Sequence, residues 1–124
     1  MRTGEPACHA AADVSVSTMV IVAMNGKVIL AVDAVTVAEV FYALRSIYGM
    51  TVRDVPRLLS NLLDTSAFEL LQRKPILGAL ERLQAVSIDF ADGYLAALAN
   101  HHSMTVASFD RDFDRFKDVA RFEP

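Results

Sequence analysis

Short apolar runs alternate along this chain with longer segments whose apolar residues recur at helical spacing. This alternation constrains the fold more than any other feature, because a parallel strand buried on both faces has a short, continuous apolar sequence. The predicted strands span 28–32, 68–71, 105–109 and 119–122. Strands that alternate with helices are typical of a parallel sheet covered on both faces. The sequence therefore predicts a three-layer α/β fold in which strands 28–32 and 105–109 are central or near-central.

The segments between these runs contain residues that begin and end helices. The carboxylate of Asp33 can accept a hydrogen bond from an amide of the first turn, and Gly49 suits the end of the same helix. Thr51 stands in a capping position before the second helix. Its inward-facing residues are expected to be Val55, Leu58, Leu59 and Leu62. The predicted helices span 34–48, 52–63, 75–85 and 89–102, with a weaker, β-branched helical pattern over 10–24.

Size and composition fit a single domain, residues 1–124, with one core. Hydrophobic residues make up 53% and charged residues 22%, which is a globular balance. The one cysteine, Cys8, excludes an intramolecular disulfide and fits a reducing compartment. No apolar run approaches the roughly 18 residues that span a bilayer, and the apolar stretch 14–23 lacks the basic start of a signal peptide. We therefore expect a cytoplasmic protein without a membrane partner.

The formal net charge of −3 excludes a protein that holds nucleic acid by charge alone. An RNA substrate would therefore have to meet a local basic rim or a bound metal ion. The best candidates for such a rim are Arg53, Arg57, Arg73 and Lys74. The alternative interpretation is that these four residues only solvate the surface.

Acidic residues stand where functional groups of open α/β sheets gather, near the carboxyl ends of strands. Glu39 lies on the second turn of the helix that follows strand 28–32. Asp92 lies on the first turn of the helix after residues 87–88, and Asp110 and Asp112 directly follow strand 105–109. We expect these four acids to converge on one end of the sheet.

Clustered carboxylates repel one another, and a hard divalent cation removes that cost. Mg²⁺ prefers oxygen ligands and is commonly held by one or two carboxylates together with substrate phosphate. The chain offers no better nucleophile, since no serine stands in a glycine-flanked elbow. A calcium loop is excluded because Arg115 stands where that loop requires glycine, and zinc-binding His-Glu-x-x-His spacing is absent.

Several of these acids also have a structural interpretation. Asp33 and Asp89 are more simply interpreted as helix caps than as ligands. Glu39, taken alone, would be a surface acid. Leu58, Leu59, Leu62 and Leu63 are interpreted as core residues or as contacts of a homodimer.

Three segments resemble the later motifs of VapC-like PIN-domain ribonucleases, the toxins of type II toxin–antitoxin systems. They are 37–45 (VAEVFYALR), 89–97 (DFADGYLAA) and 108–113 (SFDRDF), in the family's order and spacing. The resemblance implies that Glu39, Asp92 and Asp110 are catalytic, metal-site acids, that Asp112 assists them, and that Ser108 orients the site. It also implies RNA cleavage with Mg²⁺ or Mn²⁺ and neutralisation by a small VapB-like antitoxin.

The start of the sequence departs from the family pattern. The family opens with a hydrophobic strand that ends in Asp-Thr-Asn or a close variant, whereas residues 3–6 resemble the turn after that strand. Neither Asp13 nor Asp33 replaces the missing aspartate, because neither follows an opening strand. We therefore expect weak metal binding and slow or absent RNA cleavage.

Two hypotheses from different classes remain. The favoured one is a metal-dependent endoribonuclease toxin, and the alternative is a truncated, inert PIN domain that acts only as a protein- or RNA-binding module. A receiver domain is disfavoured, since the paired acids after its first strand and the lysine after its last strand are both absent.

Overall fold

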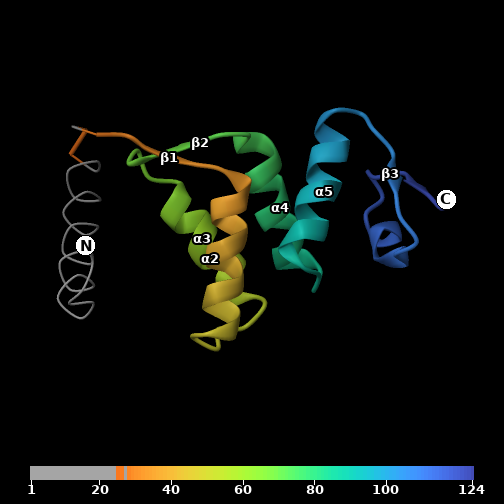
Figure 1. Cartoon of the computed structure of the whole chain (residues 1–124), viewed down its shortest axis with the longest axis horizontal. Helices are drawn as coiled ribbons and strands as arrows, with labels where there is room; N and C mark the ends of the chain where they lie inside the picture. The colour runs from red at the N-terminus through yellow and green to blue at the C-terminus, as the bar shows by residue number, and fades with distance from the viewer. Residues whose placement is uncertain (1–24, 27) are drawn as a thin grey trace, which may run out of the picture.

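Helices occupy the middle of the molecule, and short strands lie to either side of them (Figure 1). The computed structural model describes residues 25, 26 and 28–124, so the helix predicted over 10–24 lies outside the described residues. The elements in order are β1 (Leu30–Val32), α2 (Ala34–Ser46), α3 (Asp54–Leu63), β2 (Phe68–Leu70), α4 (Arg73–Ala85), α5 (Phe90–His101), β3 (Val106–Ala107), the 3₁₀ turn η1 (Arg111–Arg115) and β4 (Arg121–Phe122). The predicted α/β class is confirmed. No described helix is long and apolar enough to cross a membrane.

Helix α2 begins where the sequence predicted. The Oδ1 atom of Asp33 accepts hydrogen bonds from the Thr36 backbone amide and the Thr36 hydroxyl, each at 2.9 Å. These two bonds lower the pKa of the Asp33 carboxyl. The helix ends at Ser46, and Gly49 then takes a left-handed backbone with φ of 67°. The interpretation of Asp33 as a helix cap is confirmed.

Helix α3 begins at Asp54, two residues later than predicted. The Thr51 hydroxyl still accepts a hydrogen bond from the Asp54 amide at 3.1 Å. The buried stripe of α3 contains Val55, Leu59 and Leu63. The expectation that Leu58 and Leu62 face inward is wrong, since these side chains are 44% and 45% exposed. A 3.6-residue repeat that buries positions 55, 59 and 63 places 58 and 62 on the flank of the stripe.

Helices α4 and α5 pack closely against each other. A Cβ atom at Gly78 on α4 would lie 3.2 Å from the Cβ of Ala97 on α5, so glycine at this position permits the close approach. Gly93 on α5 is also buried, and it faces α4 near the Ala79 carbonyl oxygen. Because Gly93 follows Asp92, this packing also holds the backbone that carries Asp92. Among the largest fully buried side chains are Phe41, Ile76, Leu80 and Phe90.

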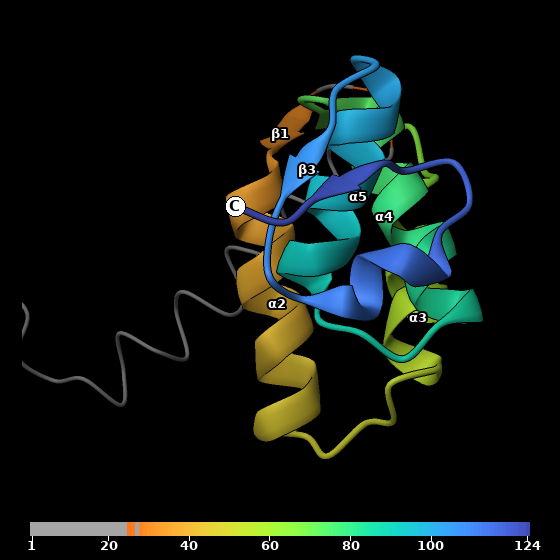
Figure 2. The same cartoon turned by 90° about the vertical axis from the view of Figure 1, so that its right-hand side faces the viewer.

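The strands pair in parallel, as predicted, but in two separate pairs. Leu30 of β1 pairs with Phe68 of β2, and Val106 of β3 pairs with Arg121 of β4. Within the described ranges no pairing joins the two pairs, so the sheet is smaller than the single sheet that the sequence predicts. Seen along the long axis, β3 lies in front of α5 with η1 below it (Figure 2).

The strands are also shorter than expected. The run 105–109 contributes only Val106–Ala107 to a strand, because the chain turns immediately afterwards. The Ser108 hydroxyl oxygen accepts a hydrogen bond from the Asp110 amide at 3.0 Å, which stabilises this turn. The turn places the acidic residues directly after β3.

Candidate functional site

Asp110 and Asp112 lie on a turn that is stabilised by their own hydrogen bonds. Asp110 precedes η1, and its Oδ1 atom accepts a hydrogen bond from the Asp112 amide at 2.9 Å. Ser108 binds the Asp110 amide from the other side, as described above, so it stands where it can orient Asp110. The sequence 108–112 therefore forms a compact acidic turn at the carboxyl end of β3.

Asp92 lies on the first turn of α5 and faces this acidic turn. Partial burial raises the pKa of the Asp92 carboxyl, and the negative charges of Asp110, Asp89 and Asp112 raise it further. Three of the four predicted site acids are therefore close enough to interact electrostatically. They come from two segments that are about 18 residues apart in the sequence.

Asp89 also belongs to this cluster, although the sequence favoured a capping role for it. It occupies the N-cap position of α5, but its side chain makes no capping hydrogen bond. Instead its charge contributes to the raised pKa of Asp92. The spacing of three residues between Asp89 and Asp92 at a helix start was the signal that both acids face the same side.

Glu39 is exposed on α2, and its charge is not among those that raise the pKa of Asp92. The two helices do meet nearby, since the ring centroids of Phe41 on α2 and Phe90 on α5 are 5.9 Å apart. Each acid thus lies two residues from the contact between its helix and the other. The structure thus brings Asp110 and Asp112 within electrostatic reach of Asp92. Helix α2, which carries Glu39, packs against α5, which carries Asp92, but no described contact involves the Glu39 side chain.

The side chains of this acidic cluster are of the chemical type that a hard cation prefers. Asp92, Asp110 and Asp112 offer only carboxylate oxygens, and partial burial together with the neighbouring negative charges raises the pKa of Asp92. Among the described residues, no group of three or more His, Cys, Asp or Glu side chains is arranged so that it could hold a metal ion. Mg²⁺ and Mn²⁺ suit such an open arrangement, because one or two carboxylates can hold them together with water and phosphate oxygens.

The four basic residues proposed for an RNA-facing rim differ in their surroundings. Arg57 pairs with Asp54 at 2.9 Å, and Arg73 contacts Asp64 at 3.7 Å. These pairs are exposed and weak, but they partly neutralise the rim. Lys74 is exposed at the start of α4. The four residues are not joined by any described contact.

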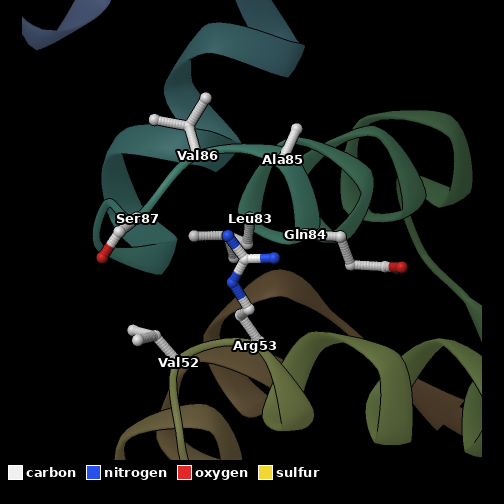
Figure 3. A pocket seen from close by; sticks show the side chains of 7 residues that line it. All are labelled: Val52, Arg53, Leu83, Gln84, Ala85, Val86 and Ser87. Atoms are coloured by element: carbon white, nitrogen blue, oxygen red, sulfur yellow. The ribbon is translucent and has the colours of Figure 1, made fainter.

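Arg53 reaches into a small cavity between the start of α3 and the connection from α4 to α5 (Figure 3). Val86 and Ser87 line the opposite wall, and the volume is about 50 Å³. This space holds a few water molecules but not a nucleotide. None of the predicted site acids lines it, so the cavity is not the reaction centre.

Two half-buried arginines bind aspartates in the C-terminal part of the chain, and the interpretation of the sequence assigned them no role. Arg121 forms a two-point ion pair with Asp114, and Arg82 forms one with Asp118. Both arginine side chains are only 13% exposed. Hydrogen bonds from the arginines lower the pKa of Asp114 and of Asp118. The Arg82 pair joins residues 36 apart, which no local sequence pattern predicts.

The protein family described as PIN domain matches residues 16–119 of this sequence. The match includes all three motif segments and every residue of the acidic cluster. No similar protein was found among curated proteins or among solved structures.

Proposed function

Because this chain belongs to the PIN domain family, a nuclease family whose members generally depend on divalent metal ions, we propose that it is a metal-dependent endoribonuclease. Its proposed substrate is RNA, and its proposed ion is Mg²⁺ or Mn²⁺. The three motif segments further support a toxin of the VapC type, which a small antitoxin neutralises in the cytoplasm.

The observation that carries this proposal is the placement of Asp92 on the first turn of α5 within electrostatic reach of Asp110 and Asp112, which lie on the turn after β3. In the part of the chain that the structure describes, neither Asp92 nor Asp110 forms an ion pair with a basic side chain, whereas Asp112 makes a long, exposed contact of 3.7 Å with Arg115. Repelling carboxylates without a cationic partner are costly in the free protein, and a divalent cation offsets that cost. An acidic cluster of this kind at a strand end suits cation binding better than it suits stabilisation of the fold.

The residues take separate roles in this proposal. Asp92 and Asp110 hold the ion, Asp112 assists them, and Ser108 orients Asp110 through its backbone amide. Glu39 contributes from α2, the helix that packs on α5 through Phe41. A divalent cation, when bound, supplies positive charge that stabilises the developing charge on the phosphate.

The basic residues and the exposed leucines give the proposed partners their surfaces. Arg53 and Lys74 supply positive charge for RNA, with Arg57 and Arg73 available once their exposed pairs with acids open. Leu58 and Leu62 project from the flank of α3, and we propose them as contacts of a homodimer.

A second candidate is a PIN domain that binds RNA or protein without cleaving RNA. The described residues favour it in one respect, since they contain no group of three or more His, Cys, Asp or Glu side chains that could hold a metal ion. The two candidates share the fold and differ in whether the acidic cluster supports turnover.

The experiment is Mn²⁺-dependent cleavage of RNA under single-turnover conditions, with excess protein so that slow cleavage is measurable. Asp92→Asn is expected to reduce the rate on the order of 100-fold, because it removes charge and a ligand oxygen from the ion site. Asp118→Asn is the matched control, since it makes the same change at an acid paired with Arg82. Equal cleavage by the protein and by Asp92→Asn would contradict the proposal. Binding of Mn²⁺ without cleavage would support the second candidate.

A further inference from the structure

Arg121 bonds to the first residue of the acidic turn and to Asp114, which follows the turn. Its Nε and Nη2 atoms donate to the two carboxylate oxygens of Asp114 at 2.9 and 3.1 Å. Its Nη1 atom donates to the Ser108 carbonyl oxygen at 3.0 Å and to Glu123 Oε1 at 3.0 Å. Asp110 and Asp112 lie between the two bonded residues, Ser108 and Asp114. One guanidinium group therefore connects the start of the acidic turn to the residue just beyond it.

The hydrogen bonds inside the turn continue this connection to the acids themselves. The Ser108 hydroxyl accepts from the Asp110 amide, and the Asp110 carboxylate accepts from the Asp112 amide. Arg121 is well placed to hold the turn, because β4 pairs with β3 and its side chain is only 13% exposed. A largely covered, planar donor group with three partners loses little freedom on binding and transmits position well.

We propose that Arg121 is a positioning residue that sets where Asp110 and Asp112 stand relative to Asp92. It acts through Ser108 and Asp114 and does not touch the ion or the RNA. The expected effect of Arg121 on metal binding rests on the proposed function. The positioning of the acidic turn itself does not require a metal ion. Lysine cannot replace arginine here, since a single ammonium group cannot form the two-point pair with Asp114 while also reaching Ser108.

The test compares Arg121→Lys with Arg82→Lys. Both substitutions keep the charge and break a two-point pair at a side chain that is 13% exposed, but only Arg121 bonds to the acidic turn. The first measurement is amide hydrogen exchange at Asp110 and Asp112 without metal. Arg121→Lys is expected to speed exchange at both amides about tenfold, whereas Arg82→Lys leaves them within about threefold of the unchanged protein.

The second measurement is the affinity for Mn²⁺ by calorimetry. Arg121→Lys is expected to weaken binding roughly 10-fold or more, as loss of an outer-shell partner does, and Arg82→Lys to leave it unchanged. If exchange at Asp110 and Asp112 is faster in Arg121→Lys and the unchanged protein binds no Mn²⁺, the positioning role is supported and the proposed metal site is contradicted. Unchanged exchange at Asp110 and Asp112 in Arg121→Lys would overturn the inference, whatever the metal affinity. Faster exchange with full Mn²⁺ affinity would also overturn it, because position would then not matter to the site.

Discussion

Two groups of aspartates lie close together in this molecule and differ in what faces them. Asp92 and Asp110 face other carboxylates, and burial together with these charges raises the pKa of Asp92. Asp114 and Asp118 face arginines, whose hydrogen bonds lower the pKa of both carboxyls. The comparison separates acids that hold the fold together from acids that remain available to a ligand.

The paired acids secure the C-terminal part of the chain. Arg82 on α4 binds both oxygens of Asp118 and also lies over the ring of Phe116, with 4.8 Å between the guanidinium carbon and the ring centroid. The Asn100 side chain donates to the Asp118 carbonyl oxygen at 3.1 Å. These contacts attach the segment after η1 to the α4–α5 pair, and the acidic turn lies at the other end of η1.

The largest difference is expected in stability without metal. Asp118→Asn should lower the free energy of unfolding by about 1 kcal/mol, because it weakens a two-point pair to a mostly buried arginine while Asp118 itself is half exposed. Asp92→Asn should not lower it, since the change relieves repulsion. Urea unfolding in a chelator at neutral pH measures both. Equal losses of unfolding free energy in the two variants would show that the aspartates facing carboxylates and those facing arginines do not differ in their effect on stability.

The pH dependence of stability should have opposite sign for the two groups. The raised pKa of Asp92 means that the folded state holds its proton more tightly, so its contribution falls as pH rises from the ordinary value of 3.8 through the raised pKa. The lowered pKa of Asp118 means that its contribution is present above 3.8 and is lost as pH falls through the lowered pKa.

Thermal unfolding from pH about 3 to about 8 measures these slopes. As pH rises, Asp92→Asn should become more stable relative to the unchanged protein, and Asp118→Asn should become less stable relative to it. Parallel curves for both variants would remove the electrostatic distinction.

The smallest effect concerns the two helix starts. Asp33 makes capping hydrogen bonds to Thr36, whereas the Asp89 side chain makes none. Asp33→Ala should lower the Tm by roughly 4 °C, and Asp89→Ala by less than about half of that. Comparable losses would indicate that Asp89 stabilises α5 through its charge at the helix start and belongs with the structural acids.

Local signals in the sequence account for what was predicted correctly. The cap at Asp33 and the turn at Gly49 depend on neighbouring residues, and both were confirmed. The parallel pairing follows from the alternation of strands and helices and was also confirmed. The charges of Asp110 and Asp112 act on Asp92, but a shared role of these acids in a metal site stays a prediction.

Contacts between distant residues account for what the sequence did not predict. The division of the strands into two pairs depends on tertiary pairing, which strand periodicity does not specify. The pairs that Arg82 and Arg121 form with Asp118 and Asp114 leave no periodic pattern. Leu58 and Leu62 were assigned to the core because apolar spacing alone does not separate the centre of a buried stripe from its flank.

The central claim is that the acids without arginine partners bind a divalent cation. Its most direct test is to titrate the unchanged protein, Asp92→Asn and Asp118→Asn with Mn²⁺. The signal of the free ion in electron paramagnetic resonance measures how much Mn²⁺ each protein binds. We expect one Mn²⁺ site in the unchanged protein, an affinity lower by about 10-fold or more in Asp92→Asn, and an unchanged affinity in Asp118→Asn. The same affinity in all three proteins, or no binding in any of them, would contradict the claim.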